Sequence, residues 1–192
     1  IIYIADSALG KKSAQATHNV EIAFELNKLM DITFLGGFYD GETLPEQLNH
    51  INNRFILKIS SRIPVKITHF YYDFWIGLKF LQTILKNRNQ IIYIRYRLTG
   101  SFLFLLFRIF RIKYIVEYND HTIEQFRFMA KYGKAWSELG KKIRTNRFTL
   151  KLIELREKNI FNNAYYIRAI TAELKKYIET LIDNKDKIKV IP

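Results

Sequence analysis

Short apolar runs alternate with helical periodicity at the start of the chain. Residues 1–5 (IIYIA) are continuously apolar and rich in β-branched side chains, which is typical of a strand buried on both faces. Residues 17–30 repeat their apolar side chains at three- and four-residue spacing, as an amphipathic helix does. Residues 32–35 are apolar again and end at Gly36-Gly37. The pattern predicts a strand, a loop, a helix and a second strand.

The same alternation continues to the last residue. Further strands are predicted at residues 55–59, 91–94, 113–117, 164–170 and 188–191, with a short extension at 65–69. Further helices are predicted at residues 71–85, 101–111, 122–158 (broken near Gly133 and Gly140) and 172–181. The first of these has one apolar face made of Phe74, Leu78, Leu81 and Leu85. Strands separated by helices predict an α/β fold, a Rossmann-like doubly wound parallel sheet flanked by helices. Neither a repeat nor a linker interrupts it, so we expect one domain over residues 1–192.

Composition narrows the possible functions. The 192 residues contain no cysteine, which excludes a disulfide scaffold, a thiolate zinc site and a cysteine nucleophile. The net charge is +13, from 31 Lys and Arg against 18 Asp and Glu, and it is spread along the chain rather than gathered in one arm. Nucleic acid, an anionic membrane, a phosphorylated ligand and a biased coding composition all remain open as reasons for it. Nucleic acid is not favoured, because no recognition motif is present and the aromatic side chains fall mostly at positions predicted to face the core.

The predicted helix at residues 101–111 allows two interpretations. Arg108 and Arg111 interrupt its apolar run well before the length that a bilayer span needs. The helix is either buried against the sheet or in partial contact with a membrane, where Arg108, Arg111 and Lys113 would meet anionic head groups. Other residues that could join such a surface are Trp75, Lys79, Lys86 and Arg88. We expect a cytoplasmic protein, on the second interpretation peripheral to the inner face of the membrane, and a fragment of a longer chain.

Ligands of open parallel sheets bind beyond the carboxyl ends of the strands, so the residues that follow strands are informative. The first such loop contains Gly10-Lys11-Lys12-Ser13, but it fails the phosphate-loop pattern, because Ala5 replaces the first glycine and Lys12 the Ser or Thr. A dinucleotide G-x-G-x-x-G is also missing. Gly10 either lets the backbone approach an anion at a helix N-terminus or forms a plain turn. The other strand ends are residues 95–100, residues 117–121 and Thr171.

Histidines and serines add no recognisable catalytic motif. His18, His50, His69 and His121 are far apart in sequence and lack the spacing of metal ligands, so no metal site is expected. No G-x-S-x-G is present, which disfavours an α/β-hydrolase. His18 at a helix start and His121 after a strand either face the ligand crevice or are structural.

A series of segments resembles one enzyme family when read in order. It comprises the helix THNVEIAFELNKL after the Gly10 loop, IIYIRY at 91–96, KYIVEYN at 113–119, NAYYI at 163–167 after a long helix, and DKIKVIP at 186–192. The series is similar to the N-terminal half of family 4 glycosyltransferases of the GT-B fold, and it spans nearly the whole chain. The chain departs from that pattern in its single Gly10, in Tyr165 where the family has Asp, and in lacking the half with Glu-x7-Glu and a basic pair.

The resemblance implies an acceptor-binding half that does not turn over alone. The family transfers a sugar from a nucleotide sugar with retention and without a required metal, so we expect no cofactor and a UDP- or GDP-sugar as substrate. The resemblance and the strand-end rule place Asn119 and His121 at the reacting sugar. The other assigned residues are Gly10, Lys11 and Ser13 at the donor, and His18, Arg95, Glu117 and Thr171 at the acceptor. Expected partners are a donor-binding domain or subunit and a glycan or lipid-linked acceptor. The alternatives are a non-catalytic subunit of a split glycosyltransferase and a basic nucleic-acid-binding domain.

Overall fold

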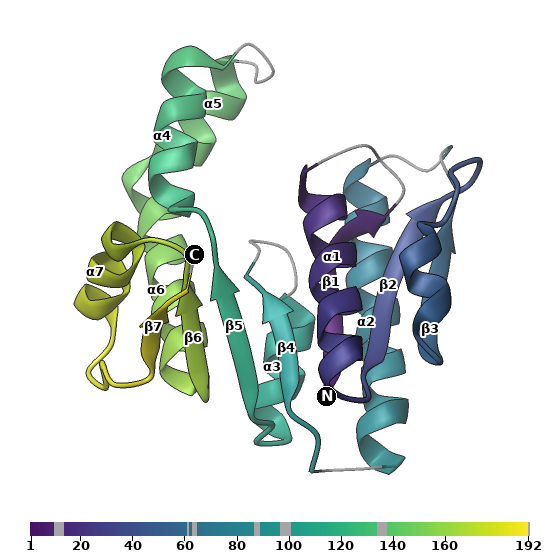
Figure 1. The fold of residues 1–192 in the computed structure, drawn as a ribbon. Helices are drawn as coiled ribbons and strands as arrows, with labels where there is room; N and C mark the ends of the chain where they lie inside the picture. Colours follow the sequence, from purple (N-terminus) through teal and green to yellow (C-terminus); the bar gives the residue numbers. More distant parts are fainter. Residues whose placement is uncertain are drawn as a thin grey trace. The chain divides into compact units, whose positions relative to one another are not determined.

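The computed structural model describes residues 1–9, 14–60, 62, 65–86, 89–96, 101–133 and 138–191 (Figure 1). Its strands are β1 (Ile2–Leu9), β2 (Thr33–Tyr39), β3 (Asn53–Ile59), β4 (Ile92–Arg95), β5 (Tyr114–Tyr118), β6 (Tyr166–Ala169) and β7 (Ile188–Val190). Its helices are α1 (Ala14–Leu29), α2 (Val65–Lys86), α3 (Ser101–Ile109), α4 (Thr122–Tyr132), α5 (Glu138–Thr145), α6 (Arg147–Asn163), α7 (Ala172–Leu181) and the 3₁₀ helix η1 (Glu46–His50).

The strands form a seven-stranded sheet in the order β3-β2-β1-β4-β5-β6-β7. The pairs β1–β2, β1–β4, β2–β3 and β6–β7 are parallel, and Ile2 lies opposite both Thr33 and Ile92. The chain runs outward from β1 to β3 and then crosses back to β4 on the other side of β1, which makes a topological switch point between β1 and β4. The predicted Rossmann-like α/β fold is confirmed.

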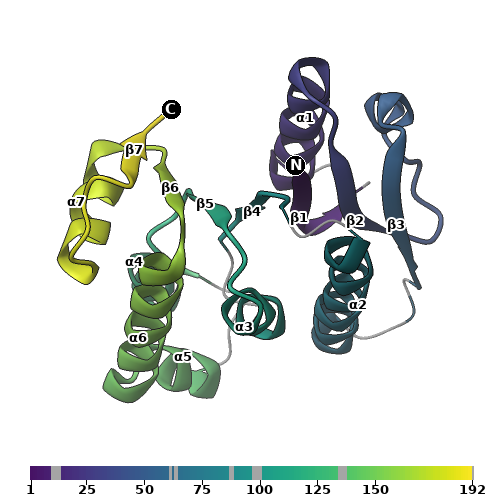
Figure 2. The same cartoon turned by 90° about the horizontal axis from the view of Figure 1, so that it is seen from below.

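The chain divides into two compact units, residues 1–115 and 116–192. The division falls inside β5 rather than in a linker. The first unit contains β3, β2, β1, β4 and the beginning of β5, with α1 on one side of the strands and α2 and α3 on the other (Figure 2). The second unit contains the rest of β5, β6, β7 and the helices from α4 to α7. The prediction of a single domain stays a prediction.

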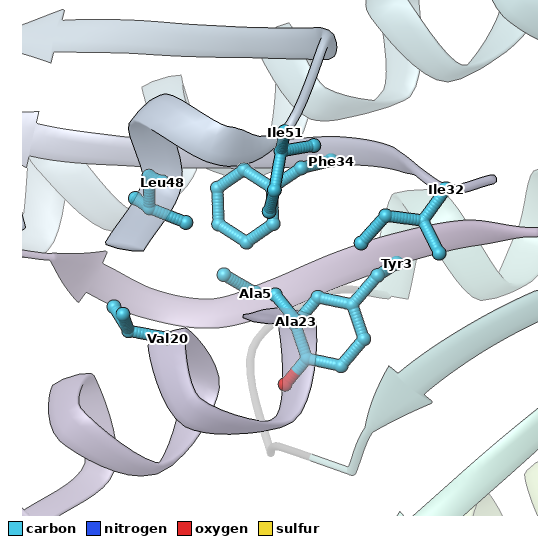
Figure 3. Close-up of a cluster of buried hydrophobic side chains, with 8 residues drawn as sticks. All are labelled: Tyr3, Ala5, Val20, Ala23, Ile32, Phe34, Leu48 and Ile51. Carbon is cyan, nitrogen blue, oxygen red and sulfur yellow. The ribbon is translucent and has the colours of Figure 1, made fainter. Parts of the chain in front are cut away.

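Tyr3 lies at the centre of a buried cluster between α1 and the strands of the first unit (Figure 3). Its ring stacks on Phe34 and on Tyr93, with centroids 5.9 and 5.6 Å apart. Its hydroxyl donates a 2.9 Å hydrogen bond to Asn19 Oδ1, and both residues are fully buried. A polar pair that is satisfied inside an apolar cluster fixes how α1 lies on β1.

Two predicted boundaries are wrong, one at the end of β2 and one at the start of α2. β2 does not close at Gly36-Gly37 but continues to Tyr39. Gly37 is needed inside the strand because a Cβ there would lie 2.7 Å from the ring of Tyr72 on α2. Residues 65–69 are not a strand extension but the first turns of α2. The β-branched residues in this segment favoured a strand, and packing on the sheet overrides that preference.

The apolar face predicted for α2 exists, but it is not the side that packs on the strands. Phe74, Leu78 and Leu85 are exposed. The buried side consists of Tyr72, Ile76, Phe80 and Ile84. α2 has two apolar stripes at helical spacing, and the pattern alone does not say which of them meets the sheet.

The long predicted helix at residues 122–158 is three helices. α4 ends at Gly133, whose N–H donates to Met129 O at 2.9 Å. The second break is not at Gly140, which lies inside α5, but at Asn146. Asn146 caps α6, because its Oδ1 accepts a 2.7 Å hydrogen bond from the Thr149 N–H.

Candidate functional site

Glu117 is a fully buried carboxylate near the carboxyl end of β5, in the second unit. Its Oε1 accepts a 2.7 Å hydrogen bond from Asn119 Nδ2, and its Oε2 accepts a 3.0 Å hydrogen bond from Arg168 Nη1 on β6. The side chains of Glu117 and Arg168 are only 1% and 19% exposed, so the ion pair is buried. Both oxygens of Glu117 have partners. We therefore expect Glu117 to act on a ligand through Asn119 and Arg168 rather than by touching it.

Asn119 follows directly after β5 and has one unused polar atom. Its amide nitrogen is held by Glu117, which fixes the direction of the side chain. Among the residues that the structure describes, none donates a hydrogen bond to Asn119 Oδ1, although this oxygen is buried. Buried acceptors in native proteins almost always have a partner. A hydroxyl group of a ligand would supply the missing donor.

His121 begins α4 as its N-cap residue. Its Nδ1 accepts a long, 3.4 Å hydrogen bond from the Glu124 N–H, which leaves Nε2 as the ring nitrogen that can donate. The ring also packs on Tyr177 of α7, with centroids 3.8 Å apart and planes inclined by 38°. The cap and the aromatic contact hold the imidazole in place, with Nε2–H as its remaining donor.

A buried carboxylate connects the tyrosines behind His121. Glu157, on the buried side of α6, accepts hydrogen bonds from the Tyr118 hydroxyl at 3.0 Å and from the Tyr177 hydroxyl at 2.5 Å. The Tyr118 hydroxyl in turn accepts a 3.4 Å hydrogen bond from the Thr122 N–H. β5, α4, α6 and α7 are thereby joined through one network. It positions the ring on which His121 rests.

Raising the pH is expected to leave Tyr118 protonated beyond the pH at which an exposed tyrosine ionises. Burial of the phenol raises its pKa, and the charge of Glu157 raises it further. Because the pKa in the folded state exceeds that in the unfolded chain, this stabilisation is present below about pH 10 and is lost as the pH rises above it. Phenolate absorbance during alkaline titration should show a late step that coincides with unfolding and is smaller by one tyrosine in Tyr118→Phe. Ionisation of Tyr118 together with exposed tyrosines would contradict this.

Thr171 is the N-cap of α7. Its Oγ1 accepts a 3.2 Å hydrogen bond from the Leu174 N–H. The pKa of Glu173 in the first turn is lowered by hydrogen bonds from its own backbone N–H and from the Thr171 side chain. Capping accounts for a threonine at this position, and its predicted contact with an acceptor stays a prediction.

The other predicted site residues belong to the first unit. Arg95 ends β4 and is half-buried, and His18 is half-buried on α1. Gly10, Lys11 and Ser13 lie outside the described residues. Within the described ranges, no cluster of three or more His, Asp or Glu side chains gathers as metal ligands do.

The structure brings Glu117, Asn119 and His121 into one unit and adds three residues that sequence reasoning missed. They are Arg168, Glu157 and Tyr177. A signal existed for Arg168, since it lies near the end of β6 as Glu117 does near the end of β5, and opposite charges on neighbouring strands pair. The sequence also contained a signal for Glu157, because this acid stands between Ile153 and Ile160 at a position where the helical spacing calls for an apolar residue. Nothing in the sequence indicated Tyr177.

Comparison with known proteins shows the kind of fold. The chain matches neither a protein-family model nor a curated protein sequence. It does match solved structures of UGT2 from Phytolacca americana. The apo structure has a TM-score of 0.54 and 12% identity, and the match covers 100% of this chain and 51% of that one. The complex with UDP-2fluoro-glucose and pterostilbene has a TM-score of 0.53 and 12% identity, with 100% and 52% coverage. The fold is therefore glycosyltransferase-like, and this chain spans about half the length of the GT-B enzyme that it matches.

Proposed function

We propose that this chain is the N-terminal, acceptor-binding half of a GT-B glycosyltransferase of family 4. The complete enzyme moves a sugar from a UDP- or GDP-sugar to a glycan or a lipid-linked acceptor, with retention and without a metal ion. Two findings support this. The whole chain matches about half of a glycosyltransferase structure, and its strand-end segments resemble those of the family in their order. The UDP-sugar analogue bound to UGT2 favours a UDP-sugar as donor.

The observation that carries the proposal is the polar group at the carboxyl end of β5. Ligands of parallel sheets bind beyond such strand ends. There Asn119 is oriented by Glu117 and has a buried oxygen that lacks a donor among the described residues. Sugars present hydroxyl groups, which are suitable donors for that oxygen. His121, fixed by its cap and by Tyr177, offers an N–H beside it in sequence.

In this proposal the residues of the chain have three roles: at the reacting sugar, at the leaving diphosphate and at the acceptor. Asn119 Oδ1 accepts from a hydroxyl of the reacting sugar, and His121 Nε2–H donates to an oxygen on which negative charge develops. The leaving diphosphate gains charge in the transition state and needs cations or N–H donors. Gly10, Lys11 and Ser13, between β1 and α1, would supply them from this half. His18, Arg95 and Thr171 would hold the acceptor.

Release of nucleotide from a panel of UDP- and GDP-sugars tests the proposal. The whole gene product should release nucleotide from at least one donor, while residues 1–192 alone should release none, because the donor-binding half is missing. Turnover by residues 1–192 alone would contradict the half-enzyme. Failure of the whole product with every donor would contradict a glycosyltransferase that is complete in one chain.

A split enzyme is the second candidate, and the half-length match fits it as well as it fits one longer chain. In that case a separate subunit binds the donor. The intact mass of the native gene product separates the two forms. A mass on the order of 40 kDa, expected for two domains of this size, means that one chain contains both halves. A mass near 22.9 kDa means that a partner subunit supplies the second.

A further inference from the structure

An exposed apolar stripe runs along α2. Six large side chains take part, and all of them are exposed: Ile67, Phe70, Tyr71, Phe74, Leu78 and Leu85. They recur at three- and four-residue spacing and so share one side of the helix, the side away from the buried stripe that meets the strands. On a helix that covers a sheet, the outward side is normally polar. Here it is aromatic and aliphatic over the full length of the helix.

The stripe continues onto α3. Leu105, Ile109 and the next residue, Phe110, are exposed. The rings of Phe74 on α2 and Phe102 on α3 lie 5.7 Å apart between their centroids. Gly77 permits this close packing, because a Cβ there would come within 2.6 Å of Phe102. Together these residues make one surface, called here the α2–α3 apolar face. A contiguous exposed apolar surface of this kind marks an interaction site.

The stretch of sequence that contains this face is almost entirely positive in its charged residues. Between Glu46 and Glu117 the sequence contains twelve Lys and Arg and a single acid, Asp73. Asp73 is buried, so it offers no negative charge to solvent. Arg108 is exposed on α3. Lys79 on α2 donates a 3.1 Å hydrogen bond to Gln82, and its Nζ lies 5.8 Å from the ring centroid of Phe55. Long basic side chains beside an apolar stripe keep their stems on the apolar surface and their charges in water.

We propose that the α2–α3 apolar face docks on an anionic lipid bilayer. α2 and α3 lie in the plane of the interface, with the apolar side chains among the acyl chains and the basic side chains at the phosphates. Within the described residues, no helix is long and apolar enough to cross a membrane. A second copy of the chain is a poorer occupant, because two faces with the same charge repel each other. This inference does not depend on the proposed enzymatic activity.

Vesicle flotation of the whole gene product tests whether the apolar side chains of the α2–α3 apolar face contribute to membrane binding. The variant is Phe70→Ser with Leu78→Ser, and the control is Leu29→Ser with Met30→Ser. The pairs are matched, since Phe70 and Leu78 are 76% and 43% exposed and Leu29 and Met30 are 78% and 42% exposed. The control pair lies at the end of α1, on the opposite side of the strands (Figure 2). On vesicles containing phosphatidylglycerol, the variant should bind about tenfold more weakly and the control should bind as the wild type does.

A second pair of variants tests the contribution of the basic side chains to membrane binding. These variants remain informative if the serine variants fail to fold. Lys79→Gln with Arg108→Gln should weaken binding to phosphatidylglycerol vesicles by about tenfold and leave binding to pure phosphatidylcholine unchanged. Lys175→Gln with Lys176→Gln on α7 is the control and should change neither. Three results would overturn the proposal: equal binding to both kinds of vesicle, no binding to either, or binding that Phe70 and Leu78 do not affect. Tighter binding to RNA than to the anionic vesicles at the same salt would do so as well.

Discussion

Glu117→Gln is expected to lower the free energy of unfolding by about 3 kcal/mol, because it leaves Arg168 without a counter-charge in a largely buried position. Glutamine keeps the shape of the side chain and one oxygen for Asn119 Nδ2, but its NH2 group then faces Arg168 Nη1, so the change removes the counter-charge and the hydrogen-bond acceptor of Arg168 together. The Glu117–Arg168 pair is 3.0 Å long, and its carboxylate is fully buried. Nη1 of Arg168 then loses its hydrogen-bond acceptor on the buried side of the pair. The measurement is chemical denaturation followed by circular dichroism.

Lys151 and Glu154 provide the matched control for that loss. This pair is also on the second unit, with an N–O distance of 3.1 Å, but both side chains are well exposed. Glu154→Gln should change the free energy of unfolding by less than about 0.5 kcal/mol. The double variant Glu117→Gln with Arg168→Met should be less destabilised than the sum of its single changes, since it removes both charges. Equal effects of Glu117→Gln and Glu154→Gln would show that the buried pair does not stabilise the unit.

Asn119→Ala is expected to lower kcat/KM of the complete enzyme by roughly 100-fold, the usual cost of removing one polar group from the reacting centre. This prediction rests on the proposed function. The change removes the oxygen that lacks a donor among the described residues and also frees Glu117 Oε1. Leaving this buried carboxylate oxygen without its donor costs about 2 kcal/mol of stability, so kcat/KM is calculated per folded protein, with the folded fraction measured by circular dichroism. Steady-state kinetics with the donor identified by nucleotide release measures the effect.

Asn163→Ala is the control for Asn119→Ala. Asn163 Nδ2 also donates hydrogen bonds, to Asn159 O and Oδ1, but it does so at the exposed end of α6, away from the strand-end group. Its replacement should leave kcat/KM within a factor of about two, since a surface change of this kind shifts stability by only a few tenths of a kcal/mol. If Asn119→Ala behaves in the same way, the reacting sugar is not at the end of β5.

Much of the fold could be predicted because the strands are short apolar runs. The runs at residues 1–5, 32–35, 91–94 and 188–191 each overlap an observed strand in all but one residue, and α7 has the predicted bounds at residues 172–181. Strands buried on both faces need such runs whatever surrounds them. The parallel sheet followed from their alternation with helices.

Features that depend on which surfaces meet could not be predicted. α2 has apolar residues on two sides, and only the packing against β2 and β3 selects Tyr72 and Ile76 over Phe74 and Leu78. The extension of β2 through Gly36 and Gly37 likewise depends on the ring of Tyr72, which comes from a helix 35 positions later in the sequence.

Only part of the candidate site could be predicted, because the rest of it also depends on which surfaces meet in the folded chain. The strand-end rule indicated Glu117, Asn119 and His121 because they lie at the end of β5 or directly after it. It could not indicate Glu157 or Tyr177, because these lie on helices that reach β5 only through tertiary packing. The rule also did not show that Glu117 is buried and paired, which changes its expected role from contacting a ligand to orienting Asn119.

The most direct test of the proposed function is the configuration of the transferred sugar. A proton NMR time course would follow the anomeric signal of the nucleotide sugar with the whole gene product, an acceptor and EDTA. A retaining, metal-independent glycosyltransferase should consume the donor and form a product with the same anomeric configuration, at a rate that EDTA leaves unchanged. A product of inverted configuration, or no consumption of any UDP- or GDP-sugar, would contradict the assignment.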